Sequence, residues 1–158
     1  MPIGPTTRQL NKILKGKHQL VDWAERGILE GLPSSTDQLP KLANYEDQNI
    51  ELGLRARSWL ESNCAHCHRE DGPAKTSGLH LLANETSPLK LGIGKAPVAA
   101  GKGSGGRKYD IVPGAPEKSI LLFRILSNDP GIMMPELGRK VVHEEGAALI
   151  SQWIKEMK

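Results

Sequence analysis

The sequence is poor in aromatic residues and contains no long apolar run. Phe, Trp and Tyr make up 4% of the 158 residues, and there is a single Phe. The polypeptide alone therefore brings little aromatic mass to a core. No apolar run approaches the roughly 18–20 residues that cross a bilayer, so no transmembrane segment is predicted. A chain of this length still predicts one main domain with a core of its own.

The charge is also small, and this bears on the class of partner. The formal net charge is +3 at pH 7. A nucleic-acid-binding protein usually carries a concentrated basic stripe, and no such stripe is visible in the sequence. We therefore predict no nucleic-acid partner, and the oligomeric state stays open.

The sequence has 17 glycines and 11 prolines, which suits short helices joined by long irregular loops. Apolar residues at helical spacing predict helices over residues 8–15, 19–30, 49–62, 117–126 and 144–157. No convincing strand pattern is present, so the fold class predicted is all-α. We expect residues 1–48 to form an N-terminal helical extension and connector, and residues 49–158 to form the main domain.

The two cysteines stand in Cys64-Ala65-His66-Cys67-His68, the C-x-x-C-H attachment sequence of a c-type haem. On one helical turn, positions i and i+3 share a face, so both thiols can reach one edge of a flat ring. The imidazole of His68 then points under the ring toward the iron. The motif predicts one covalently bound haem c, whose porphyrin would add the apolar mass that the core lacks. It leaves no cysteine for a structural disulfide.

The iron of a low-spin electron carrier needs a second ligand opposite the histidine, and Met134 is our candidate. The methionine thioether is a soft ligand that favours Fe(II) over Fe(III). Pro135 follows Met134 directly and fixes the loop. Met133 is the nearest competitor, whereas His80 or His143 would give bis-histidine ligation and a lower potential.

Together these motifs resemble those of class I cytochrome c domains. The likeness covers about residues 50–155 and is carried by residues 55–60 (RARSWL), the haem motif, Met134-Pro135 and residues 149–154 (LISQWI). It implies a cytochrome c-like fold, in which the helix before the haem motif crosses the C-terminal helix. Trp59 would then lie against Trp153 or its neighbours.

Residues 113–119 (PGAPEKS) further resemble haem domains at the C-termini of large exported bacterial oxidoreductases. In those proteins the cytochrome domain commonly receives electrons from a neighbouring catalytic domain. The resemblance therefore implies an electron carrier without catalysis of its own, whose partner is a redox protein or an adjacent catalytic domain. Covalent haem attachment of this kind takes place outside the cytoplasm, so a periplasmic or otherwise exported location is expected. The first residues show no signal peptide, and we expect an excised or processed segment of a longer exported protein.

Two other functions remain open at this point. A haem enzyme or gas sensor would keep the sixth position vacant or exchangeable and needs a polar distal pocket, for which the sequence shows no obvious histidine or arginine. A thiol redox pair or a zinc site would use Cys64, Cys67, His66 and His68. Such sites usually occur with a βαβ pattern or with spaced ligand pairs, and neither is present.

Several basic residues are candidates for shielding haem propionates or attracting an acidic partner, although such side chains are often merely solvated. They are Lys95, Lys102, Arg107 and Lys108, with Arg124 and Arg139 as further candidates. Residues 101–106 match G-x-G-x-x-G literally, but no βαβ unit surrounds them, so a flexible surface loop is expected.

The group that orients His68 is undecided in the sequence. Many class I domains have a proline soon after the haem histidine, and its carbonyl accepts the Nδ1–H of the imidazole. Pro73 is the one proline soon after His68, but its spacing is unconvincing.

Overall fold

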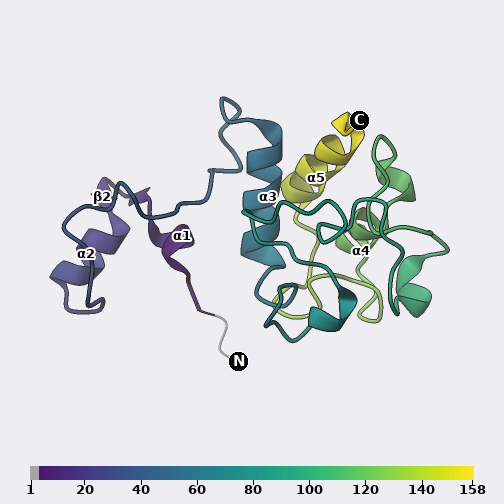
Figure 1. Ribbon diagram of the computed structural model, residues 1–158, viewed down its shortest axis with the longest axis horizontal. Helices are drawn as coiled ribbons and strands as arrows, with labels where there is room; N and C mark the ends of the chain where they lie inside the picture. Colours follow the sequence, from purple (N-terminus) through teal and green to yellow (C-terminus); the bar gives the residue numbers. More distant parts are fainter. Residues whose placement is uncertain (1–3) are drawn as a thin grey trace. The chain divides into compact units, whose positions relative to one another are not determined.

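The computed structural model describes residues 4–158. The chain divides into two compact units, with the boundary between Ala43 and Asn44. This division lies a few residues before the expected boundary at residue 48. Among the described residues, no helix is long and apolar enough to cross a membrane. The protein is rich in helices (Figure 1).

The first unit contains helices α1 (Thr7–Leu10) and α2 (Gln19–Glu25), with a short hairpin of β1 (Ile13–Leu14) and β2 (Lys17–His18) between them. The prediction of a helix over residues 8–15 is therefore wrong beyond Leu10. Lys15 and Gly16 both have positive φ, at 51° and 79°, as a tight hairpin turn requires. The prediction of an all-α fold without strands is also wrong here, because β1 and β2 pair as a two-stranded hairpin.

A polar cluster holds the connector of the first unit to its helices. Asn11 is buried, and its side-chain amide donates to the carbonyl of Leu39 over 2.8 Å. The Oδ1 of Asn11 lies 2.9 Å from Nε2 of His18. The backbone N–H of Leu42 donates to the carbonyl of Arg8 over 3.0 Å. The segment that reads as a loose connector is thus hydrogen-bonded to the elements before it.

The second unit is built on helices α3 (Leu52–Asn63), α4 (Ile120–Leu126) and α5 (Glu144–Glu156). Three short 3₁₀ helices, η1 (Lys75–Ser77), η2 (Gly101–Ser104) and η3 (Pro116–Lys118), interrupt its long loops. Figure 1 shows α3 and α5 side by side, and α4 packs against α5. The three helices predicted for this region are confirmed, with ends that differ by a few residues.

The apolar faces of α3 and α5 form most of the core of this unit. Glu51 begins α3, since its carboxylate accepts the free N–H groups of Gly53 and Leu54 at 2.7 and 2.9 Å. Apolar spacing predicts Leu52, Ala56, Trp59 and Leu60 on the inner face of α3, and Ala148, Leu149, Trp153 and Ile154 on that of α5. All but two of these are buried in one cluster; Leu52 is only partly buried, and the prediction is wrong for Ala148, which is exposed. The haem motif begins at Cys64, directly after the last residue of α3, so the packing of α3 also holds the start of the motif.

Trp59 of α3 makes a close contact with the start of α5. Its indole is stacked with the imidazole of His143, with ring centroids 6.0 Å apart. Gly146, in the first turn of α5, lies directly against the same indole, and a Cβ added to it would collide with Trp59 and His143. A residue without a side chain is therefore needed at position 146.

We predict that Gly146→Ala lowers the free energy of unfolding by about 1–3 kcal/mol, the usual cost of overpacking. The matched variant Ala148→Gly lies at an exposed position of the same helix. There glycine should cost about 1 kcal/mol through helix propensity alone. Urea unfolding followed by circular dichroism would compare the two. If Gly146→Ala raised the free energy of unfolding while Ala148→Gly lowered it, Trp59 would not lie as close to α5 as described.

Candidate functional site

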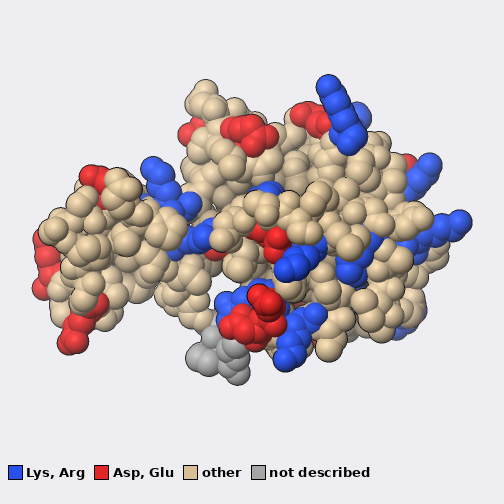
Figure 2. Space-filling model, viewed as in Figure 1, with Lys and Arg blue, Asp and Glu red and all other residues tan. Residues whose placement is uncertain are grey.

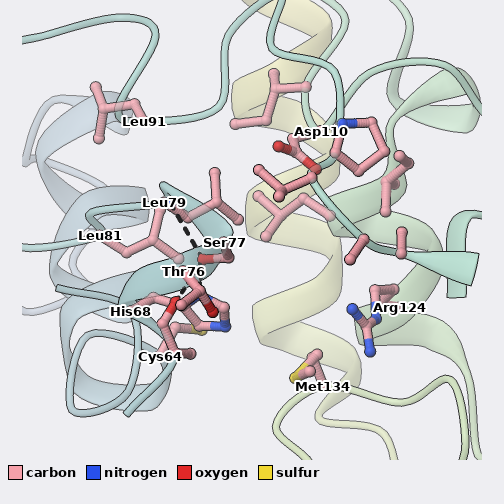
Figure 3. Close-up of a pocket in the computed structure, with 18 residues that line it drawn as sticks. Cys64, His68, Thr76, Ser77, Leu79, Leu81, Leu91, Asp110, Arg124 and Met134 are labelled. Carbon is pink, nitrogen blue, oxygen red and sulfur yellow. Dashed lines mark hydrogen bonds between the residues drawn. The ribbon is translucent and has the colours of Figure 1, made fainter. Parts of the chain in front are cut away.

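One cavity of the second unit is lined by Cys64, His68 and Met134 together. Its volume is about 280 Å³, near the lower end of the roughly 300–1,000 Å³ of small-molecule sites. Figure 3 shows Cys64 and His68 on one side of the cavity and Met134 on the other, with the sulfur of Met134 directed toward His68. Most other lining residues are apolar, among them Leu79, Leu81, Leu91, Ile111, Ile120 and Leu121. Residues 66 positions apart in the sequence thus meet at one apolar hollow.

The haem motif forms a tight turn at the end of α3. The carbonyl of Cys64 accepts the backbone N–H groups of Cys67 and His68 at 3.1 and 2.9 Å. This i to i+3 bond holds Cys64 and Cys67 within one turn, as the spacing predicts. Neither thiol is in a disulfide, and Cys64 is buried. Gly72 packs on the carbonyl of Cys67 so closely that no side chain would fit there.

His68 is held by two contacts from the loop that follows it. Its carbonyl accepts the N–H of Leu81 at 2.9 Å, and its Nδ1 lies 3.0 Å from Oγ of Ser77. Ser77, and not Pro73, is therefore the partner of the imidazole. The sequence carried no local signal for Ser77, because its position depends on how residues 69–78 fold back over the motif.

Burial sets the protonation of the motif. It lowers the pKa of His68 to about 4, with smaller contributions from the charges of Arg124 and His66. At neutral pH the imidazole is therefore uncharged, which is the form that binds a metal. Burial raises the pKa of Cys64 to about 12, and Cys67 adds to this rise. The thiol of Cys64 is thus protonated at neutral pH and is a poor nucleophile.

The loop that carries Met134 is fastened to the end of α4. The N–H of Met134 donates to the carbonyl of Arg124 over 3.0 Å, and Nε of Arg124 donates back to the carbonyl of Ile132 over 2.8 Å. Nη1 of Arg139 donates to the carbonyl of Ile125 over 2.7 Å. Two arginines and two backbone segments therefore set the position of the thioether.

The residues that compete with Met134 as the predicted second ligand lie elsewhere. Met133 and His80 line neither the cavity of His68 nor a second cavity of about 180 Å³ on the other side of Met134. His143 lines the second cavity, where its Nδ1 accepts the N–H of Gly146 at 3.0 Å and caps α5. Of the four candidates, Met134 shares a cavity with His68.

Lys95, Lys102, Arg107 and Lys108 do not line the cavity of His68, but Asp110, the partner of Lys95, does. Lys95 and Asp110 form a buried ion pair at 3.2 Å, although burial raises the pKa of Asp110 against the effect of the lysine. The guanidinium of Arg107 lies 4.1 Å from the ring centroid of Phe123. Lysine and arginine are spread over the face that Figure 2 shows and form no single stripe on it.

Arg124 and Arg139 differ from these residues. Arg124 lines the cavity of His68, and Arg139 lines the second cavity. Burial lowers the pKa of both guanidinium groups, but an arginine stays protonated in proteins. Arg124 thus brings a positive charge to the wall beside Met134 (Figure 3).

Comparisons of this chain with protein families, curated proteins and solved structures find no match. The resemblance to class I cytochrome c domains therefore stays a prediction. Within residues 4–158, no three side chains of His, Cys, Asp and Glu gather as a metal site. The G-x-G-x-x-G segment contains η2, which ends at Ser104 before Gly105 at a φ of 55°.

We predict that Arg139→Ala lowers the free energy of unfolding by about 1–3 kcal/mol, because carbonyls at the end of α4 lose their donor. Besides Ile125, the side chain reaches the carbonyl of Ser127. Arg139→Lys should restore only part of this loss, since an ammonium cannot reproduce the planar fork. Lys140→Ala, at an exposed neighbouring position, is the control and should change stability by less than about 0.5 kcal/mol. Equal effects of the two alanine variants in denaturant unfolding would contradict the assigned role.

Proposed function

We propose that this protein is an electron carrier with one covalently attached haem c, held through Cys64 and Cys67 and ligated by His68 and Met134. The observation that carries the proposal is the single apolar cavity that has Cys64, His68 and Met134 in its walls. A ring tethered at the haem motif would need a second ligand, and Met134 lies across the cavity from Cys64 and His68 (Figure 3).

The donors present fit a haem in their chemistry. Both thiols are free, and the imidazole of His68 is uncharged at neutral pH, with Nδ1 occupied by Ser77 and Nε2 left as the ligand atom. A thioether opposite a neutral imidazole gives a low-spin site of high potential. The crossing of α3 with α5, next to the motif, agrees with the cytochrome c-like fold that the resemblance implies.

A bound haem would supply a reversible one-electron couple, and the residues of the cavity would set its properties. Leu81, Ile111 and Ile120, all buried, give the cavity apolar walls. Arg124 would place a positive charge near the thioether and favour the reduced state of the iron, while the carboxyl of Asp110 in the same wall would act against it. The hydrogen bonds that fasten the Met134 loop limit its movement, so that little rearrangement accompanies electron transfer.

The partner and location follow from this proposal. A carrier without a substrate site of its own exchanges electrons with a redox protein or with an adjacent catalytic domain. Since covalent haem attachment at C-x-x-C-H takes place outside the cytoplasm, we place the protein in the periplasm or another exported location.

A haem enzyme or gas-sensing domain is the second candidate, and Arg124 is the observation that favours it. The sequence offered no obvious distal arginine, yet Arg124 lines the cavity on the side of Met134. If Met134 were not bound to iron, this guanidinium could stabilise an exogenous ligand. Rapid binding of carbon monoxide to the reduced, untreated protein would identify this function.

The thiol and zinc hypotheses have less support. Among residues 4–158 no three side chains of His, Cys, Asp and Glu gather as a metal site, and no βαβ unit surrounds the two cysteines. A protein mass equal to that of the bare polypeptide, after expression with haem-attachment machinery, would nevertheless support them over haem.

We predict that Met134→Ala abolishes the weak far-red absorption band of the sulfur–iron bond and lowers the midpoint potential. The fall should be at least about 60 mV, which is a tenfold change in a one-electron equilibrium constant. The opened position should also bind carbon monoxide or cyanide rapidly. Optical spectra and a redox titration of the mature protein measure all three effects.

Met133→Ala is the matched control, since it removes the neighbouring thioether from the same loop. It should keep the far-red band and the potential of the unmodified protein. An unchanged spectrum in Met134→Ala, or loss of the band in Met133→Ala, would contradict the assignment of Met134.

A further inference from the structure

The hydroxyl of Ser77 stands at the junction of three hydrogen bonds. Its oxygen lies 2.7 Å from the carbonyl oxygen of Ala74, 3.2 Å from the backbone nitrogen of Leu79 and 3.0 Å from Nδ1 of His68. A hydroxyl has one proton to donate and two lone pairs to accept with. All three positions of the Ser77 hydroxyl are therefore used.

The roles of these partners fix the proton on His68. A carbonyl can only accept, so the Ser77 proton goes to Ala74, and a backbone N–H can only donate, so Leu79 takes one lone pair. The remaining lone pair must receive a proton from His68. Nδ1 of His68 therefore carries the hydrogen, and Nε2 of the neutral ring carries the free lone pair.

We propose that Ser77 is the positioning residue that fixes the tautomer and orientation of His68 and tunes its strength as an iron ligand. The inference rests on the proposed function. An imidazole that donates its Nδ1–H is a more electron-rich ligand through Nε2, and such a ligand favours Fe(III). The bond from Ser77 to Ala74 polarises the hydroxyl and makes it a better acceptor. Ser77 thus takes the place of the proline carbonyl that the resemblance suggested.

The chain contains a matched control for this role in Ser104. Ser77 is the last residue of η1 and precedes Gly78 at a φ of 68°, while Ser104 is the last residue of η2 and precedes Gly105 at 55°. Ser104 likewise donates to the carbonyl three residues earlier at 2.9 Å and accepts the N–H two residues later at 3.3 Å. The two serines share the same local bonds, and Ser77 has the imidazole in addition.

The experiment compares Ser77→Ala with Ser104→Ala in the full-length, haem-loaded protein. Covalent attachment and the far-red band are checked first in the unmodified protein, and their absence would refute the proposed function itself. With both present, Ser77→Ala should raise the midpoint potential by about 59 mV, a tenfold change in the equilibrium constant, while Ser104→Ala leaves it unchanged. Ser77→Thr keeps the hydroxyl and should have the midpoint potential of the unmodified protein. Equal potentials in the two alanine variants, with the far-red band retained, would overturn the role of Ser77.

A second measurement begins with the unmodified protein. In the reduced, ¹⁵N-labelled unmodified protein, NMR should show a proton bound to Nδ1 of His68 that exchanges slowly with water. Ser77→Ala should accelerate this exchange, and Ser104→Ala should not. An Nδ1 without a proton in the unmodified protein would overturn the inference even if Ser77→Ala failed to fold.

Discussion

The close contact of Trp59 with Gly146 is the constraint on which the rest of the second unit depends. It sets how near α3 and α5 can approach, and both walls of the candidate site are attached to these helices. The haem motif turns off the end of α3, and the Met134 loop runs between α4 and α5. A change in the helix spacing would therefore move Cys64 and Met134 relative to each other. Stability and ligand geometry are thus coupled through one pair of residues.

Backbone hydrogen bonds carry this constraint from the helices into the loops. The cavity lies among segments with little regular structure, so its side chains are held by individual bonds to carbonyls. Arg124 has two roles: its Nε donates to the carbonyl of Ile132, and its side chain lines the cavity. A substitution that removes its charge also removes this hydrogen bond and loosens the loop of Met134. A change in potential after substitution of Arg124 would therefore mix geometry with electrostatics, which is why the matched serines are the cleaner test.

The sequence predicted those parts that depend on local pattern. The helices of the second unit follow from apolar spacing, and the turn at Cys64–His68 follows from the motif. The helix predicted over residues 8–15 failed where Lys15 and Gly16 adopt positive φ, because a tight hairpin turn overrides an apolar pattern only one turn long. Ser77 was missed for another reason. Its contact with His68 depends on the path of the whole loop between them, and neither spacing nor composition encodes that path.

In the proposed carrier, the two iron ligands would be tuned in opposite directions. Met134 and the nearby charge of Arg124 would favour the reduced state, whereas the bond from His68 to Ser77 would favour the oxidised state. Each effect depends on a group whose position is fixed by the backbone: Met134 through the carbonyl of Arg124, and Ser77 through the carbonyl of Ala74. The midpoint potential would then depend on the positions of both loops. A substitution at Ser77 would change the potential and leave both iron ligands in place, whereas a substitution at Met134 would change the ligand set and the potential together.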